Sequence, residues 1–238
     1  MSVHSIEGQR PPATAADAQS VRRQPRETTM TGVKVHRLLP GVAGSALVVA
    51  ATALAASSPL DKIVLTAAQV GPGYQRVAQA TSRGTSAPTL DLCGYRFTSE
   101  GRRTDRLQVG YARPGSAIAF SNEVVTYAPG GTALAMRELN AAIAHCPSGA
   151  VTSPGSTVPP LRYRVTRLHG TGLLSGALYF SMHVYGTVNG QSASLTAAVA
   201  YQVHGNRLSG VYAYGGTAVD RNAEDLRVAK LSAKNLSG

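Results

Sequence analysis

The chain has 238 residues, with 23 Lys and Arg against 12 Asp and Glu, and a formal net charge of +11 at pH 7. From residue 56 onward, 17 basic residues still face 9 acidic ones, but the arginines form only short groups at 102–106 and 162–167. A nucleic-acid surface needs a larger basic patch with polar or aromatic readers, so this pattern argues against nucleic-acid binding. The positive field favours anionic envelope polymers or lipid headgroups as partners, and a plain solvated basic surface is the alternative.

An apolar segment near the N-terminus has the pattern of an export signal. Two basic residues, Lys34 and Arg37, precede an uncharged run that ends in small residues. Basic residues, an apolar stretch and small residues before a cleavage point are the parts of a secretory signal peptide. We expect cleavage between Ala55 and Ala56 and a secreted or cell-envelope, extracytoplasmic protein. An uncleaved membrane anchor is the alternative, because about 20 apolar residues suffice to span a bilayer.

The residues before this signal contain few large aliphatic side chains. Residues 1–29 are rich in Arg, Gln, Pro, Ala and Thr. Such a segment buries too little apolar surface to offset the entropy lost on ordering. It is either a disordered tail or the product of a mis-assigned start, in which case Met30 is the initiator and 30–55 is a signal peptide of ordinary length. Residues 56–238 then suit a single compact domain.

The chain has two cysteines, Cys93 and Cys146. An even number of cysteines outside the reducing cytosol indicates a disulfide. Two thiols without a C-x-x-C spacing do not suit structural zinc, which takes four ligands. We therefore expect a Cys93–Cys146 disulfide and no metal site.

The remaining pattern predicts strands and helices in separate runs. Alternating apolar residues and turn signals predict strands at about 74–79, 105–113, 118–127, 161–169, 176–187, 192–204 and 207–215. Helical spacing and stop signals predict a short helical entry at 60–70 and helices at 132–145 and 220–231. This order predicts an α+β fold, with an antiparallel β-sheet, helices packed on one face and one disulfide.

We expect a ligand groove on the face of the sheet that the helices leave free. In the strand at 176–187, Tyr179, His183 and Tyr185 alternate with apolar residues, and Tyr201 and Tyr212 add aromatic surface from neighbouring strands. Aromatic side chains with a polar tip suit ligand contacts, although tyrosines also populate half-buried strands for packing reasons. The polar segment at 147–160 is either the rim of this groove or a surface connector.

Catalytic signals are weak. The sequence has no G-x-S-x-G, H-E-x-x-H, Walker or G-x-G-x-x-G motif. Glu123 lies within an apolar strand and suits a salt bridge better than a general base. His183 and His204 are two histidines without a third ligand, which makes a metal site improbable.

A family resemblance lies in two stretches, LDLCGYRFTSEGRRTDRLQVGYA at 90–112 and SNEVVTYAPGGTALAMRELNAAIAHCP at 121–147. They resemble the actinobacterial secreted sensor-domain proteins, which are similar to the extracellular domain of the serine/threonine kinase PknH. The matching positions are Leu92-Cys93, Ser99-Glu100, Arg103, Asn122 to Val125, Tyr127, Pro129 to Gly131 and Cys146-Pro147. The resemblance implies an α+β domain with a cleft for an unidentified ligand and no enzyme activity. This chain departs from it in having one cysteine pair instead of two and no lipid-attachment cysteine at the end of the apolar run.

The sequence as a whole predicts an exported, sensor-like domain that binds a small molecule, a lipid or an envelope component. We expect no enzyme activity and no cofactor, and we assign no catalytic residue. Two alternatives remain open at this point: a structural adhesion or interaction protein of the cell envelope, and a hydrolase that uses a serine or Glu123.

Overall fold

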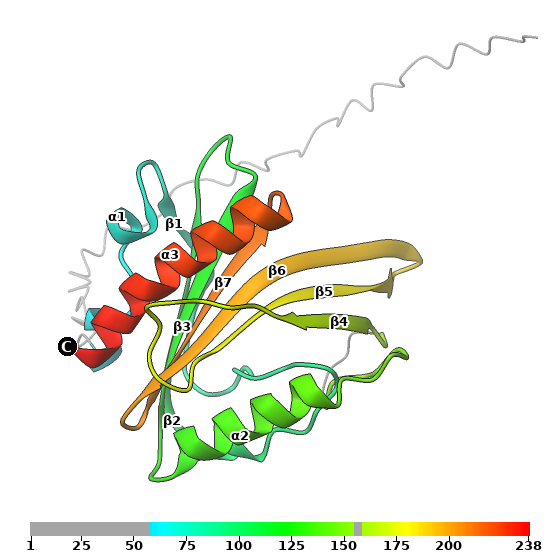
Figure 1. Ribbon diagram of the computed structural model, residues 1–238, viewed down its shortest axis with the longest axis horizontal. Helices are drawn as coiled ribbons and strands as arrows, with labels where there is room; N and C mark the ends of the chain where they lie inside the picture. The colour runs from blue at the N-terminus through cyan, green and yellow to red at the C-terminus, as the bar shows by residue number, and fades with distance from the viewer. Residues whose placement is uncertain (1–57, 155–158) are drawn as a thin grey trace, which may run out of the picture. The chain divides into compact units, whose positions relative to one another are not determined.

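The computed structural model describes residues 58–154 and 159–238, and the predicted signal segment with its Ala55–Ala56 cleavage point lies outside these residues. Seven strands form one antiparallel sheet in the order β1-β2-β3-β7-β6-β5-β4 (Figure 1). They are β1 (Gln75–Arg83), β2 (Arg103–Ala112), β3 (Ile118–Tyr127), β4 (Arg162–Arg167), β5 (Leu178–Val188), β6 (Gln191–His204) and β7 (Arg207–Gly215). The predicted α+β fold and antiparallel sheet are confirmed.

Two-residue turns connect β5, β6 and β7 as the sequence predicts. Asn189 and Gly190 both have positive φ, 51° and 76°, between Val188 and Gln191, which end and begin their strands. Two successive residues with positive φ match the twist of an antiparallel hairpin, which explains the Asn-Gly pair at this turn. Gly205, with φ of 59°, begins the second turn.

Helices lie on both faces of the sheet, not on one face as expected from the sequence (Figure 1). The helical elements are η1 (Pro59–Lys62), α1 (Ala67–Val70), η2 (Thr98–Arg102), α2 (Gly131–Ala144) and α3 (Ala218–Ser237). The α3 helix packs on one face, together with the chain entry at 60–70, and α2 packs on the other. The reason is that both faces carry apolar side chains, and each needs its own cover.

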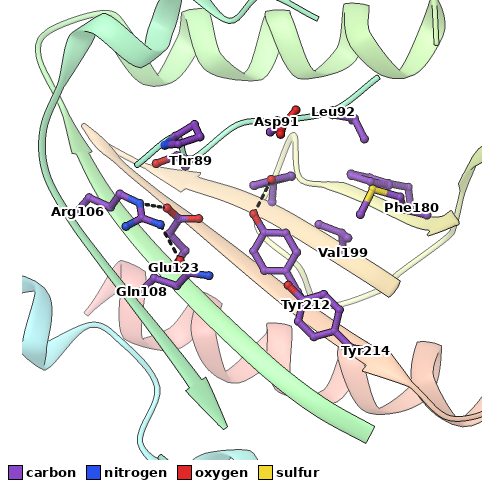
Figure 2. Close-up of a pocket in the computed structure, with 13 residues that line it drawn as sticks. Thr89, Asp91, Leu92, Arg106, Gln108, Glu123, Phe180, Val199, Tyr212 and Tyr214 are labelled. Carbon is purple, nitrogen blue, oxygen red and sulfur yellow. Dashed lines mark hydrogen bonds and ion pairs between the residues drawn. The ribbon is translucent and has the colours of Figure 1, made fainter. Parts of the chain in front are cut away.

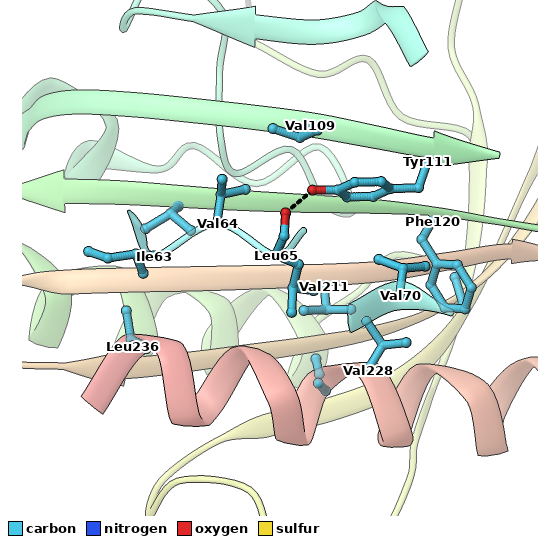
Figure 3. Close-up of a cluster of buried hydrophobic side chains, with 14 of the residues drawn as sticks. Ile63, Val64, Leu65, Val70, Val109, Tyr111, Phe120, Val211, Val228 and Leu236 are labelled. Carbon is cyan, nitrogen blue, oxygen red and sulfur yellow. Dashed lines mark hydrogen bonds between the residues drawn. The ribbon is translucent and has the colours of Figure 1, made fainter. Parts of the chain in front are cut away.

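The core under α3 is built mainly from aliphatic side chains. Val109, Val124 and Val211 from three strands are fully buried against Val228 of α3 (Figure 3). The Tyr111 hydroxyl donates a hydrogen bond to the carbonyl oxygen of Leu65 and so ties the chain entry to the sheet. Alternate residues of each strand supply this core because successive side chains point to opposite faces.

The second core lies between α2 and the other face of the sheet. Ala135, Leu139 and Ala142 form the buried stripe of α2 and pack against residues such as Phe180 and Leu208. Just beyond α2, the predicted disulfide between Cys93 and Cys146 is present. It links the end of α2 to the segment that precedes η2.

Two elements are longer than predicted. The first strand continues to Arg83, with an irregular register between Val77 and Ser82. The last helix continues to Ser237, because Ala233 and Leu236 are buried against the chain entry. Within residues 58–154 and 159–238, no helix combines the length and the apolar character needed to cross a membrane.

Candidate functional site

A cavity of about 190 Å³ lies on the α2 face of the sheet, beneath the segment that joins β1 to η2 (Figure 2). Its wall combines charged, polar, aromatic and aliphatic side chains from five strands and from that segment. The lining residues are Pro88, Thr89, Asp91, Leu92, Arg106, Gln108, Glu123, Phe180, Met182, Val199, Tyr201, Tyr212 and Tyr214. A partly apolar cavity with a few convergent polar groups is the usual form of a small-molecule site.

The register of the strands brings these side chains together. One row across the sheet runs from Gln108 in β2 through Glu123 in β3 and Gly210 in β7 to Tyr201 in β6. Directly opposed residues share a face, so Glu123 and Tyr201 point to the same side. A side chain at Gly210 would crowd the rings, because its Cβ would lie 3.0 Å from Tyr201 Cε1 and 3.2 Å from Tyr212 Cε2.

A buried ion pair forms the polar wall of the cavity. The Arg106 Nε donates to a carboxylate oxygen of Glu123, and the two side chains are 3% and 4% exposed. The Arg106 guanidinium also donates to Ser82 Oγ at 2.9 Å and to Gln108 Oε1 at 2.6 Å. These hydrogen bonds fix the guanidinium, which therefore holds one orientation toward the carboxylate.

Burial gives the Glu123 carboxyl an unusual acidity. Loss of solvent raises the pKa of Glu123 to about 7, while the neighbouring Arg106 charge opposes the rise. Desolvation disfavours the charged form of a carboxyl, so the cavity wall exchanges a proton near neutral pH. A buried carboxyl with a shifted pKa in a cavity marks a candidate functional site.

Aromatic side chains form the other part of the wall. The hydroxyl oxygens of Tyr201 and Tyr212 are 2.6 Å apart and share a hydrogen bond. The rings of Phe180 and Tyr201 are stacked with centroids 6.2 Å apart, and the rings of Tyr212 and Tyr214 are parallel at 6.1 Å. Burial raises the pKa of Tyr201 and of Tyr212, so both hydroxyls stay protonated and remain hydrogen-bond donors.

The segment above the cavity is held by three attachments. The Glu100 carboxylate accepts hydrogen bonds from the backbone N–H groups of Thr89 and Leu90, at 2.8 and 3.1 Å. The Arg103 guanidinium donates to the carbonyl oxygens of Thr85 and Ala87, at 2.8 and 2.6 Å. The disulfide then fixes the far end of the segment at Cys93. The cavity is therefore covered by a backbone with a defined position.

A second, larger pocket of about 590 Å³ adjoins the cavity. Pro88 and Asp91 line both, so the covering segment lies between the two spaces. The larger pocket is lined by Tyr95, Phe97 and Arg103, among others. Its charged groups Glu100 and Arg103 already serve to hold the covering segment, and we therefore place the candidate site in the smaller cavity.

The five side chains expected to share one groove lie on both faces of the sheet. Tyr201 and Tyr212 line the cavity. Tyr179 is buried under α3, where its hydroxyl donates to the carbonyl oxygen of Asn222 at 2.6 Å. His183 and Tyr185 share the face of Tyr179. The single groove proposed from the sequence is therefore not formed, because Tyr179, His183 and Tyr185 point to the face of the sheet opposite Tyr201 and Tyr212.

The polar segment at 147–160 approaches the cavity at one point. Val151 pairs with Leu161, and the Ser153 hydroxyl donates a hydrogen bond to Asp91, which lines the cavity. Pro154 lines the larger pocket. The first part of the segment therefore borders the covering segment, while 155–158 lie outside the described residues.

Glu123 was expected from the sequence to form a salt bridge, but neither its partner, Arg106, nor the cavity was predicted. Arg106 alternates with apolar residues in β2, which places it on one face of the strand, and Glu123 lies on the same face of β3, opposite Gln108. A charged residue at a core-facing position in each of two adjacent strands was the available signal. Gly210 within a strand was a second one, because an interior glycine often marks a close approach.

The Glu123 carboxylate has close partners within the cavity. It accepts a hydrogen bond from Arg106, and the side chain of Thr89 is a second hydrogen-bond partner that helps to lower its pKa. Ser194 and His183 form a serine–histidine hydrogen bond of 2.8 Å, but it lies on the opposite face of the sheet and on exposed strands. No group of three or more His, Cys, Asp or Glu that could hold a metal ion occurs within 58–154 and 159–238.

Among solved structures, the extracellular domain of PknH from Mycobacterium tuberculosis is similar to this chain. The TM-score is 0.46 and the sequence identity is 11%, and the match covers 73% of this chain and 94% of that one. No protein-family model and no curated protein matches the sequence. The expected membership of the actinobacterial secreted sensor-domain proteins is therefore not shown and stays a prediction.

Proposed function

We propose that this protein is an extracytoplasmic, non-catalytic binding domain of the sensor type, and that the cavity over Glu123 and Tyr212 is its ligand site. The observation that carries the proposal is the junction of a buried Arg106–Glu123 pair with a wall of aromatic rings. Such a wall can bury the apolar part of a small molecule, while the carboxyl and the tyrosine hydroxyls orient its polar groups.

The dimensions of the cavity set the class of ligand. A volume of about 190 Å³ suits a molecule, or the end of a larger one, about the size of a single ring. The ring would lie against Phe180 and Tyr212. A donor on that ring would face Glu123, whose proton exchange near neutral pH lets it either accept or donate a hydrogen bond.

The disulfide supports the proposed location. Structural disulfides persist in oxidising compartments and are rare in the cytosol. The Cys93–Cys146 bond joins the covering segment to α2 and is part of the cavity's construction. The proposed export signal is consistent with the same compartment.

The proposal is tested by native mass spectrometry of the full-length protein purified from its own host. We expect a bound small molecule on the unaltered protein and its loss from Met182→Trp, which fills the cavity from a half-buried position. Val165→Trp is the matched control, because Val165 pairs directly with Met182 on the same face but does not line the cavity. Equal retention in both variants would place the ligand elsewhere.

A direct titration complements this experiment. Benzamide, p-cresol and methyl glucoside, added separately to the isotope-labelled protein, probe an aromatic amide, a phenol and a sugar. We expect at least one of them to shift the NMR signals of Thr89, Gln108 and Tyr212 together, and to lose this effect in Met182→Trp. If none of the three shifts these signals and no molecule co-purifies, the cavity is a packing defect and the proposal fails.

A further inference from the structure

A second surface with binding chemistry lies on the α3 face of the sheet, beyond the end of α3. In β4 and β5, Arg162 pairs with Tyr185 and Arg164 pairs with His183, and all four side chains share this face. Opposed residues lie about 5 Å apart, and residues two apart along a strand about 7 Å apart. The four side chains therefore form a compact square, which we call the β4–β5 patch.

The patch is open because α3 does not extend over it. The core under α3 includes Tyr179 of β5 and Ala198 of β6, but not the residues nearer the β5–β6 turn. A hydrogen bond from Arg221 Nη1 to Thr196 Oγ1, 3.3 Å long, marks the edge of the cover. Figure 1 shows the β5–β6 hairpin continuing past α3. Arg162 and Arg164 are exposed there.

No carboxylate of the described residues compensates the charge of the patch. The sequence from 139 to 219 contains no Asp or Glu, although it carries four arginines and four histidines. Within the described ranges, neither Arg162 nor Arg164 takes part in an ion pair. Asp220, the next carboxylate along the chain, accepts a hydrogen bond from Thr217 at the start of α3. The two guanidinium groups are therefore available to an external anion.

The other half of the patch is a platform of stacked rings. The rings of His183 and Tyr185 have centroids 4.9 Å apart at an angle of 29°. The His183 Nε2 and the Ser194 hydroxyl are 2.8 Å apart, which holds the imidazole in place. Both residues are half-buried, so the stacked pair keeps part of its surface exposed to solvent beside the arginines. Flat aromatic surface next to fixed positive charge suits a ligand with both apolar faces and anionic groups.

We propose that the β4–β5 patch binds an acidic polysaccharide chain. Each guanidinium would hold a carboxylate of a sugar residue through two parallel hydrogen bonds, and a sugar ring would lie on Tyr185 and His183. A nucleic acid would require neutralisation of several phosphates, and a membrane surface a cluster of four or more basic residues. Two arginines beside two rings match a chain with one negative charge per ring.

The test is calorimetric titration of the full-length protein with an oligogalacturonate, which carries one carboxylate per sugar, and with a neutral cello-oligosaccharide of equal length. We expect binding of the acidic chain only, weakening as salt is raised because the contacts are exposed. The Arg162→Gln/Arg164→Gln variant should lose about tenfold or more in affinity, since it removes the charge-assisted hydrogen bonds to the carboxylates. Tyr185→Ser should weaken binding without changing its salt dependence.

The matched control is Arg137→Gln/Arg167→Gln, which removes the same charge from the α2 side of the sheet. Arg137 is exposed on α2, and Arg167 donates to Asn140 from the opposite face of β4. Its affinity should stay within about twofold of the unaltered protein. Equal losses of affinity in both double variants would show that binding depends on net charge and not on the patch, and would overturn the proposal. Absence of binding at low salt, or equal binding of anionic phospholipid vesicles or single-stranded DNA, would overturn it as well.

Discussion

The two faces of the sheet handle buried polar groups in different ways. On the α3 face, the Asn122 amide accepts from the backbone N–H of Leu65 at 2.9 Å and donates to Ser209 Oγ at 3.0 Å. Gln202 likewise joins Leu174 to the backbone of α3 at Ala229. On the α2 face, the buried Arg106 and Glu123 border a cavity instead of a packed interface.

We interpret this as a difference between the packed core under α3 and the proposed ligand cavity on the α2 face. Amides that bridge separate chain segments use up their hydrogen-bonding capacity and fix the arrangement of those segments. A buried ion pair contributes little net stability, because desolvation of the two charges offsets their attraction. A role in the proposed ligand site would account for the presence of the pair beside a cavity. Substitutions on the two faces should therefore differ in their effects on stability and on ligand retention.

Loss of the disulfide should have the largest effect, because it should lower both the stability of the protein and the ligand retention of the cavity. The Cys93→Ser/Cys146→Ser variant opens a loop with a sequence separation of 53 residues. Chain entropy predicts a loss of about 4 kcal/mol in the free energy of unfolding. The covering segment should also become looser and weaken ligand retention. Urea unfolding with and without a reducing agent measures the first effect, and a stability loss below about 1 kcal/mol would contradict it.

Truncation of the α3-face core should lower stability without affecting the binding site. Leu107 is 1% exposed and packs in the core under α3. Leu107→Ala should cost about 3 kcal/mol, from lost apolar burial and the cavity that remains. Ligand retention in native mass spectra should be unchanged under conditions where the variant is folded. A loss of ligand from the folded variant would show that the two faces are coupled.

The pH dependence of stability should depend on the buried carboxyls. The folded pKa of Glu123, about 7, lies above its value of 4.5 in an unfolded chain. The folded state therefore binds more protons between these values, and stability falls as pH rises from about 4.5 to about 7, by roughly 3 kcal/mol from this group. Thermal unfolding across this window should show the decrease in the unaltered protein and a smaller one in Glu123→Gln.

Asp225 provides the comparison on the α3 face. Burial raises its pKa well above the ordinary value, and neither carboxylate oxygen has a hydrogen-bond partner in the described part of the chain. Asp225→Asn should therefore also reduce the loss of stability with rising pH, but without changing ligand retention. An unaltered pH profile in both variants would contradict the assignment of the pH dependence to these groups.

The smallest effect should come from the tyrosine pair. Tyr201→Phe removes the hydrogen bond to the Tyr212 hydroxyl and should cost about 1 kcal/mol. Tyr127→Phe is the matched control, because the Tyr127 hydroxyl is buried without a hydrogen-bond partner among the described residues. Its removal should be neutral or stabilising. Chemical denaturation resolves the difference, and equal losses in both variants would show that ring packing, not the hydroxyl pair, determines the result.

Local sequence patterns were sufficient for most of the secondary structure. The alternation in β2, β3 and β5 and the Asn189-Gly190 turn act over a few residues, so the chain does not need tertiary contacts to express them. The disulfide was also predictable, because two cysteines in a chain expected to be exported allow one pairing. The ends of β1 and α3 were missed, since burial of Ala233 and Leu236 extends α3 beyond its local pattern.

The sequence by itself determined which residues of a strand share a face, since side chains alternate with a period of two. Only the tertiary structure decided which faces of different strands coincide. Pairing of β3 with β7, distant in the chain, sets Glu123 opposite Gly210 and on the side of Tyr201. A shift of one residue in the register between β3 and β7 would have turned Tyr201 and Tyr212 to the face opposite Glu123. Such long-range register depends on the packing of both cores at once, and no local pattern encodes it.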